Sequence, residues 1–201
     1  NNAGLRRNIE IIPNPVDVER FSLENVEREE VAQVRSKYNI PNDAFVGCIV
    51  SRVGKEKSID VLLDYIAKYS KKNEKFRFLI VGDGPAKKDL EAQAKRLGID
   101  NVVIFTGKVP NGQLLPYYAA CDVFLTASLS DTNSISMLEA MSMGLPIIQR
   151  EDVINKGQVV ENVNGFIFTD EVTFAEKLDL AYNRSAVDRV ELSKRVRNSV
   201  I

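Results

Sequence analysis

The sequence predicts an α/β fold in which a doubly wound, mainly parallel sheet of about six strands is flanked by helices. Short apolar runs alternate with longer segments of helical periodicity along the chain. The apolar runs are continuous and do not alternate with polar residues, a pattern typical of strands buried on both faces. Because strands and helices alternate, the crossovers should be right-handed. In such sheets, ligands bind at the carboxyl ends of the strands.

The first half of the chain supplies the first group of strands and helices. Apolar runs predict strands at residues 9–13, 44–51, 76–84 and 101–107. Helical spacing predicts helices at residues 26–38, 59–71 and 86–98. The first helix should stop near Pro41 and the third at Gly98, because proline and glycine commonly end helices.

The second half continues the alternation. Strands are predicted at residues 122–128, 145–149 and 164–168. Helices are predicted at residues 111–121, from residue 133 or 134 to about residue 143, at residues 156–161, and over two further stretches at the end of the chain.

Bulk properties predict one domain over residues 1–201, cut from a longer protein, because the chain starts abruptly and ends in a charged helical pattern. The 27 basic and 28 acidic side chains nearly cancel, so no basic excess favours nucleic acid or an anionic membrane surface. No apolar run approaches the ~20 residues that span a bilayer, and no signal peptide opens the chain. We therefore expect a cytoplasmic protein.

The cysteines and the absent histidine narrow the chemistry. Cys48 and Cys121 lie in apolar runs and are predicted to be buried free thiols of a reducing compartment, with a disulfide as the less favoured alternative. The sequence contains no histidine, so this chain cannot supply the commonest general base.

Three strand-to-helix loops carry candidate ligand contacts. Arg52 and Lys57, in "SRVGKEKS", suit a diphosphate, and the alternative is a solvated basic loop. The stretch "VGDGP" matches neither common phosphate-loop pattern, so a tight turn is the favoured interpretation. Gly107 and the backbone around Val109, in "FTGKVPNGQ", could contact a flat base, although an ordinary loop fits equally well.

The fourth loop, "SDTNSISMLEAMSMG", contains two carboxylates, Asp131 and Glu139. Asn133 or Ser134 can cap the following helix, whose start would attract a phosphate group. Eight residues of helix separate the carboxylates by roughly 12 Å. Glu139 shares one helix side with Ile135 and needs a polar partner. Ribose hydroxyls are the favoured partner, and a salt bridge to one of the two loop cations is the alternative.

These segments together resemble the nucleotide-sugar-binding half of retaining glycosyltransferases with two Rossmann-like domains (the GT-B type), and more narrowly the group 1 glycosyltransferases. The resemblance runs from "IIPNPVDVERF" to "VVENVNGFIF", nearly the whole chain. It includes "SRVGKEKSIDVLL", "FLIVGDGP", "VIFTGKVPNGQLLPYYAACDVFLTAS" and "SDTNSISMLEAMSMGLPII". Each segment alone is weak, but their order and spacing are specific.

The resemblance implies a role for each matching position on a nucleotide-sugar donor. Arg52 and Lys57 match the pair that binds the diphosphate, and Val109 matches the backbone contact to the base, beside Gly107. Glu139 matches the carboxylate that holds the ribose hydroxyls.

The phosphates and the sugar are assigned to the fourth loop. The backbone amides of Asn133, Ser134 and Ile135 match those over the phosphates. Asp131 matches the first carboxylate of the family's E-x7-E pattern, beside the donor sugar, and is the candidate catalytic residue. It orients the sugar or stabilises positive charge at the anomeric carbon, and we do not assign it as a nucleophile.

The chain departs from the family pattern at three places. Asp131 replaces the usual glutamate, Thr132 to Ser134 replace a Gly-Phe-Gly-like stretch, and Pro15 stands where glycine is usual. The family's acceptor-binding domain, with its catalytic histidine, is absent from this chain. We expect that absent domain to be the main partner, to supply any membrane association, and to be needed for turnover.

The expected reaction transfers a hexosyl-type sugar from a UDP-, GDP- or ADP-sugar to an acceptor with retained anomeric configuration. Cations and helix amides would stabilise the leaving diphosphate, with no metal and no cofactor. The alternatives are a nucleotide-binding module without transferase activity and one half of a sugar-nucleotide epimerase. A dinucleotide-dependent oxidoreductase ranks far below, because its GxGxxG motif is missing.

Overall fold

The computed structural model describes residues 16–129, 134–153 and 157–201, so the strand predicted at 9–13 lies outside it. The strands are β1 (Phe45–Val50), β2 (Phe76–Val81), β3 (Val103–Gly107), β4 (Val123–Thr126), β5 (Ile147–Arg150) and β6 (Gly165–Phe168). The helices are α1 (Arg28–Lys37), α2 (Ile59–Tyr69), α3 (Lys87–Leu97), α4 (Leu115–Ala119), α5 (Ile135–Ser142), α6 (Glu171–Tyr182) and α7 (Ala186–Asn198).

The described strands form one parallel sheet in the order β3-β2-β1-β4-β5-β6. The chain first builds outward from β1 to β3, then returns beside β1 and builds outward again from β4 to β6. The predicted doubly wound α/β fold is therefore confirmed. Strand order reverses between β1 and β4, and this switch point is where such sheets open a crevice for ligands.

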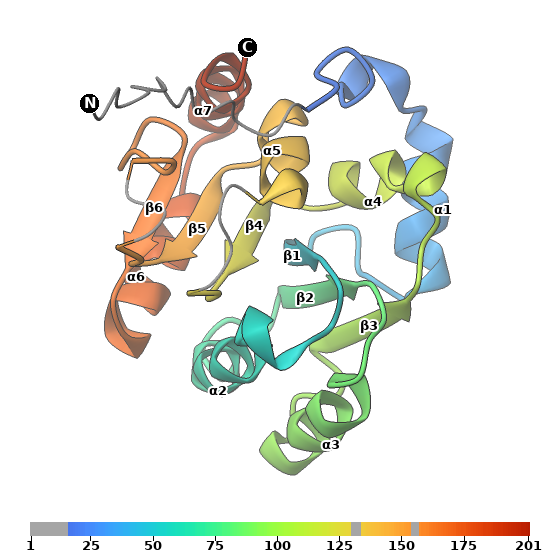
Figure 1. Cartoon of the computed structure of the whole chain (residues 1–201), viewed down its shortest axis with the longest axis vertical. Coiled ribbons are helices and arrows are strands. Elements are labelled where there is room, and N and C mark those ends of the chain that lie inside the picture. The colour runs from blue at the N-terminus through green and yellow to red at the C-terminus, as the bar shows by residue number, and fades with distance from the viewer. Residues whose placement is uncertain (1–15, 130–133, 154–156) are drawn as a thin grey trace, which may run out of the picture.

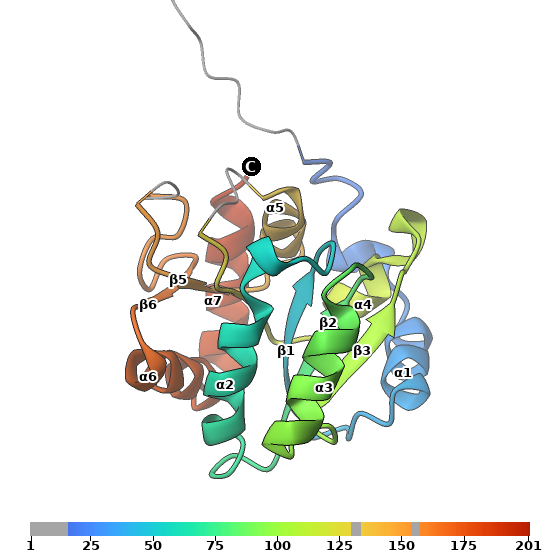
Figure 2. The ribbon, with the colours of Figure 1, turned by 60° about the horizontal axis from the view of Figure 1, so that its bottom comes forward.

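Helices cover both faces of the sheet. Figure 1 shows α2, α3 and α6 on one side and α1, α4, α5 and α7 on the other. Figure 2 shows α2 and α3 packed side by side against the sheet. All six residues of β1 are buried, as the continuous apolar runs predict. Cys48 and Cys121 are both buried free thiols, in agreement with the favoured prediction.

The helix predicted at 156–161 is wrong over its described part, since residues 157–161 form turns and isolated bridges. The reason is the buried side chain of Asn164. Its Oδ1 accepts from the Val160 amide at 2.7 Å, and its Nδ2 donates to the Gln158 carbonyl at 3.1 Å. These bonds take up backbone groups that a helix would have used.

The element ends also differ slightly from the expected ones, with strands that stop earlier than the apolar runs. The strand predicted at 76–84 ends at Val81, and the one predicted at 122–128 covers Val123–Thr126. The extra residues belong to the loops at the carboxyl edge, where the candidate site lies. Among the described residues, none of the helices combines the length and apolarity of a bilayer span.

Candidate functional site

An open cleft of about 800 Å³ lies at the carboxyl edge of the sheet, over the switch point. Loops after β1, β2 and β3 form one wall and the start of α5 forms the other. The cleft brings together most of the residues that the sequence predicts as donor contacts: Arg52, Lys57, Val109, Ser134, Ile135 and Glu139. Segments more than eighty residues apart in sequence therefore meet at one edge.

The loop after β1 presents its two cations because the residue between them is anchored. Val53 is fully buried, its amide donates to the Asp83 carbonyl at 3.0 Å, and its carbonyl accepts from the Ala86 amide at 3.1 Å. Arg52 is exposed and Lys57 is half-buried, and both line the cleft. The anchored valine holds this loop against the loop after β2. The backbone positions from which the Arg52 and Lys57 side chains extend are therefore fixed.

The turn after β2 shapes the floor of the cleft. Gly82 has a φ of +144°, and its amide donates to the Gly107 carbonyl at 3.0 Å. A Cβ atom at Gly82 would lie 1.9 Å from the Ser51 carbonyl oxygen, so only glycine allows the two loops to approach this closely. The tight turn predicted for this stretch is confirmed.

The loop after β3 contributes Lys108 and half-buried Val109 to the cleft. Gly107 is the last residue of β3 and has a φ of +73°. It does not line the cleft, and it bonds to the Gly82 amide instead. Lys108 adds a cation that the sequence analysis missed, since one lysine in a polar loop carries no distinctive pattern.

The helix α5 starts at the cleft with Ser134 at its N-cap position, as predicted. The Ser134 side chain does not cap the helix; its Oγ lies 3.1 Å from the Ser136 Oγ. Helix geometry leaves the first amides of α5, at Ile135 and Ser136, without acceptors inside the helix. These groups and the helix dipole give the cleft a positive end.

Glu139, a predicted site residue, is unusual because its carboxylate side chain is nearly buried, with only 6% of the residue exposed. The Tyr118 hydroxyl donates to its Oε2 at 2.8 Å, and the Ser136 carbonyl oxygen lies 3.2 Å from the same hydroxyl. Burial raises the pKa of Glu139, while the Tyr118 hydrogen bond and the charge of Arg20 oppose this rise. The carboxylate is therefore held in place and costs energy when ionised.

The alternative partner expected for Glu139 is Arg52 or Lys57, in a salt bridge. Among the described residues, Glu139 forms no salt bridge with either of them. Its hydrogen-bond partner Tyr118 lies on α4 and is fully buried. Sequence reasoning missed this tyrosine, because an aromatic residue in a short apolar helix is usually core. No sequence signal links residues 118 and 139.

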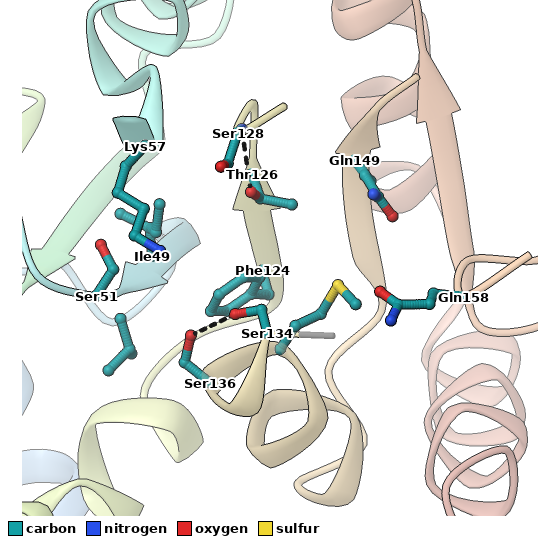
Figure 3. A pocket seen from close by; sticks show the side chains of 12 residues that line it. Ile49, Ser51, Lys57, Phe124, Thr126, Ser128, Ser134, Ser136, Gln149 and Gln158 are labelled. Carbon is teal, nitrogen blue, oxygen red and sulfur yellow. Dashed lines mark hydrogen bonds between the residues drawn. The ribbon is translucent and has the colours of Figure 1, made fainter. Parts of the chain in front are cut away.

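A small recess adjoins the cleft and shares five lining residues with it: Val50, Ser51, Lys57, Ser134 and Ser136. It lies between the ends of β1, β4 and β5 and the start of α5 (Figure 3). Asp131 and Asn133 lie outside the described residues. The catalytic role of Asp131 and the amide contact at Asn133 therefore stay predictions.

Comparison with known proteins gives a family match over most of the chain. The family model described as "Glycosyl transferases group 1" matches residues 30–199. The alpha-monoglucosyldiacylglycerol synthase of Acholeplasma laidlawii is 34% identical over 158 residues, covering 79% of this chain and 40% of that protein. The protein of the same name from Streptococcus pneumoniae is 30% identical over 161 residues, covering 80% and 36%. The chain thus spans well under half the length of these two relatives.

Solved structures share the fold. Anabaena Alr3699/HepE, in complex with UDP and glucose, superposes with a TM-score of 0.80 at 21% identity, covering 94% of this chain and 51% of that chain. The C-terminal domain of a group 1 glycosyl transferase family protein (LpcC) from Francisella tularensis gives a TM-score of 0.76 at 21% identity. That match covers 92% of this chain and 96% of the solved domain.

Proposed function

The chain belongs to the group 1 glycosyl transferases, and from that premise we propose that it is the donor-binding domain of a transferase. The enzyme would move a hexosyl-type sugar from a nucleotide diphosphate sugar to an acceptor, with retention of anomeric configuration. The observation that carries this proposal is the cleft itself. Two loop cations, a helix start and a buried, pre-positioned carboxylate face one space at the switch point.

The donor would lie along the carboxyl edge of the sheet. Its diphosphate would contact Arg52, Lys57 and the first amides of α5, since planar and mobile cations together suit phosphate oxygens. The base would lie near Val109, and the ribose hydroxyls would bond to Glu139. As the sugar leaves, charge develops on the diphosphate, and these groups are already in place to stabilise it. This assignment needs no metal ion or cofactor.

The remaining steps would use groups beyond the described residues. Asp131 would stand beside the sugar, where its carboxylate could orient the ring or stabilise positive charge at the anomeric carbon. An acceptor-binding domain in the rest of the protein would complete the site. Since the relatives from Acholeplasma and Streptococcus are named as synthases of monoglucosyldiacylglycerol, we propose a diacylglycerol-type lipid acceptor, reached at a membrane surface.

Calorimetry with UDP, GDP and ADP against their nucleosides tests the donor site. Arg52→Ala and Lys57→Ala should each lower the affinity for whichever nucleoside diphosphate binds by about 10- to 150-fold. This loss is the equivalent of one charge-assisted hydrogen bond. Binding of the matching nucleoside should hardly change, because it carries no phosphate. Lys95→Ala, an exposed cation on α3, is the matched control. Equal losses for nucleotide and nucleoside would contradict the assignment of the cations to the phosphates.

A further inference from the structure

The recess beside the cleft has room for one small polar group. Its volume is about 10 Å³, which is the space that a single water-sized group occupies. Its shared lining with the cleft places it within reach of any molecule bound there. It is too small for a phosphate group or a sugar ring, but it can take one hydroxyl.

Gln149, near the end of β5, projects into this recess with unused hydrogen-bonding capacity. It is only 6% exposed, and its side-chain amide forms no hydrogen bond within the described part of the chain. Gln149 pairs with Thr126 of β4 in the sheet, and Figure 3 shows the two residues on neighbouring strands near the strand ends. The amide nitrogen and oxygen of Gln149 are not among the buried polar atoms that lack a partner, so they face the open space of the recess and are available to a group that enters it.

Most of the neighbouring serine hydroxyls already have hydrogen-bond partners. The Ser134 and Ser136 hydroxyls form a pair, and the Ser128 hydroxyl donates to the Glu56 carbonyl at 3.0 Å. The buried Ser51 hydroxyl is the exception, with no partner among the described residues. The recess therefore offers the Ser51 hydroxyl and the Gln149 amide to whatever enters it, and the side chains of Lys57 and Gln158 also line it.

The order of the strands indicates which part of the donor would reach Gln149. Val109 follows β3, the cations follow β1, and Gln149 lies on β5. Strands in a sheet are about 4.8 Å apart, so β3 and β5 each lie about 10 Å from β1, on opposite sides. If the diphosphate lies over β1 and the base extends toward β3, the sugar extends toward β5. An amide both donates and accepts hydrogen bonds, as a sugar hydroxyl does.

We propose that Gln149 determines donor specificity by hydrogen-bonding one hydroxyl group of the donor's sugar in this recess. This inference rests on the proposed function, and it assigns a role to a residue on β5 that the sequence analysis did not single out. Gln149 is not needed for binding the nucleotide itself. Its loss should therefore affect nucleotide sugars and spare the sugar-free nucleotides.

The test compares the chain with Gln149→Met, which keeps the length of the side chain and removes the amide. Calorimetry would measure UDP-glucose, GDP-mannose and ADP-glucose against UDP, GDP and ADP. For whichever sugar nucleotide binds together with its parent nucleotide, the ratio of the two affinities should fall about two- to tenfold in the variant. This change corresponds to the free energy of one neutral hydrogen bond. Affinity for the plain nucleotide should not change. Gln33→Met, at an exposed position on α1, should leave both affinities unchanged.

Monodeoxy analogues of the bound sugar nucleotide give the sharper arm of this test. The unmodified chain should bind one of these analogues more weakly than the parent sugar nucleotide. For that analogue, the Gln149→Met variant and the unmodified chain should have the same affinity, because the hydrogen bond is already lost. If the methionine variant does not fold, Gln149→Asn, which draws the amide back by one methylene, should show the same selective loss. An unchanged affinity ratio would overturn the role of Gln149 and leave the proposed function intact. If the unmodified chain binds none of the nucleotides, the proposed function itself fails.

Discussion

At the scale of single residues, Glu139 is the strongest indication of function. Glu139 is a nearly buried carboxylate, and burying an ionised carboxylate lowers the stability of the folded chain. Burial also raises its pKa. The folded state then binds its proton more tightly than the unfolded state does. Stability therefore falls as pH rises from the ordinary glutamate pKa through the raised value in the folded chain.

We predict that Glu139→Gln stabilises the chain at neutral pH and weakens nucleotide binding. The neutral amide still accepts the Tyr118 hydrogen bond but carries no charge to bury, so the gain should be about 0.5–2 kcal/mol. Urea unfolding across about pH 4 to 8 should show this gain growing with pH and vanishing in acid, where Glu139 is already neutral. Nucleotide affinity should fall about 10- to 150-fold through the lost charge. Lower stability at neutral pH, or unchanged affinity, would contradict this account.

Tyr118 is predicted to act through Glu139. Tyr118→Phe removes the hydroxyl that holds Oε2, so the carboxylate loses its orientation. Affinity for a ribonucleotide should fall about threefold to tenfold, and affinity for its 2′,3′-dideoxy analogue should stay nearly constant. The matched control is Tyr117→Phe, because the Tyr117 hydroxyl faces Tyr38 at 3.4 Å, away from the cleft. Equal losses for both nucleotides would mean that Tyr118 has only a packing role.

At the scale of elements, α7 ties the start of the described chain to the end of α5. The guanidinium of Arg197 donates to the carbonyls of Val18, at 3.0 Å, and Phe21, at 2.8 Å, and also to that of Ser142. These three acceptors belong to two segments far apart in sequence, residues 18–21 and the end of α5, whose last residue is Ser142. The helix that opens onto the cleft is therefore fixed at its far end by one side chain.

We predict that Arg197→Ala destabilises the chain by about 2–4 kcal/mol, because three carbonyl groups lose a charged donor. Arg197→Lys should recover little, since an ammonium group lacks the planar fork that reaches several carbonyls at once. Urea unfolding would measure both changes. Arg195→Ala, at an exposed position on the same helix, should change stability by less than about 0.5 kcal/mol. A loss equally large at Arg195 would assign the effect to the helix in general.

At the scale of the whole molecule, the chain carries an open cleft, which we propose binds the donor, and its sequence contains no histidine. We predict that residues 1–201 alone bind a nucleoside diphosphate and transfer little or no sugar, because the acceptor-binding domain that we propose for the rest of the protein would be needed to complete the site. Calorimetry would detect the binding, and release of nucleotide from a sugar donor would report turnover. Sustained transfer by the chain alone would contradict the view that catalysis needs a second domain.

The sequence by itself determined the order and type of most elements and one edge of the site. Continuous apolar runs are a local signal, and they are sufficient to predict parallel strands buried on both faces. Because parallel strands end at the same edge, residues after those strands had to converge, and Arg52, Lys57 and Glu139 do. The prediction of a helix near Gln158 was wrong because the side chain of Asn164, four to six residues further along the chain, hydrogen-bonds to the backbone of Gln158 and Val160.

Only the tertiary structure decided which polar groups meet. Tyr118 and Glu139 are 21 residues apart, and Arg197 reaches a carbonyl 179 residues away. The recess at Gln149 depends on how α5 lies across the ends of neighbouring strands. Such pairings depend on distances of a few ångströms between elements, and these are set by side-chain packing of the whole core. Apolar periodicity specifies which face of an element is buried, but it does not specify which hydrogen-bonding group lies opposite.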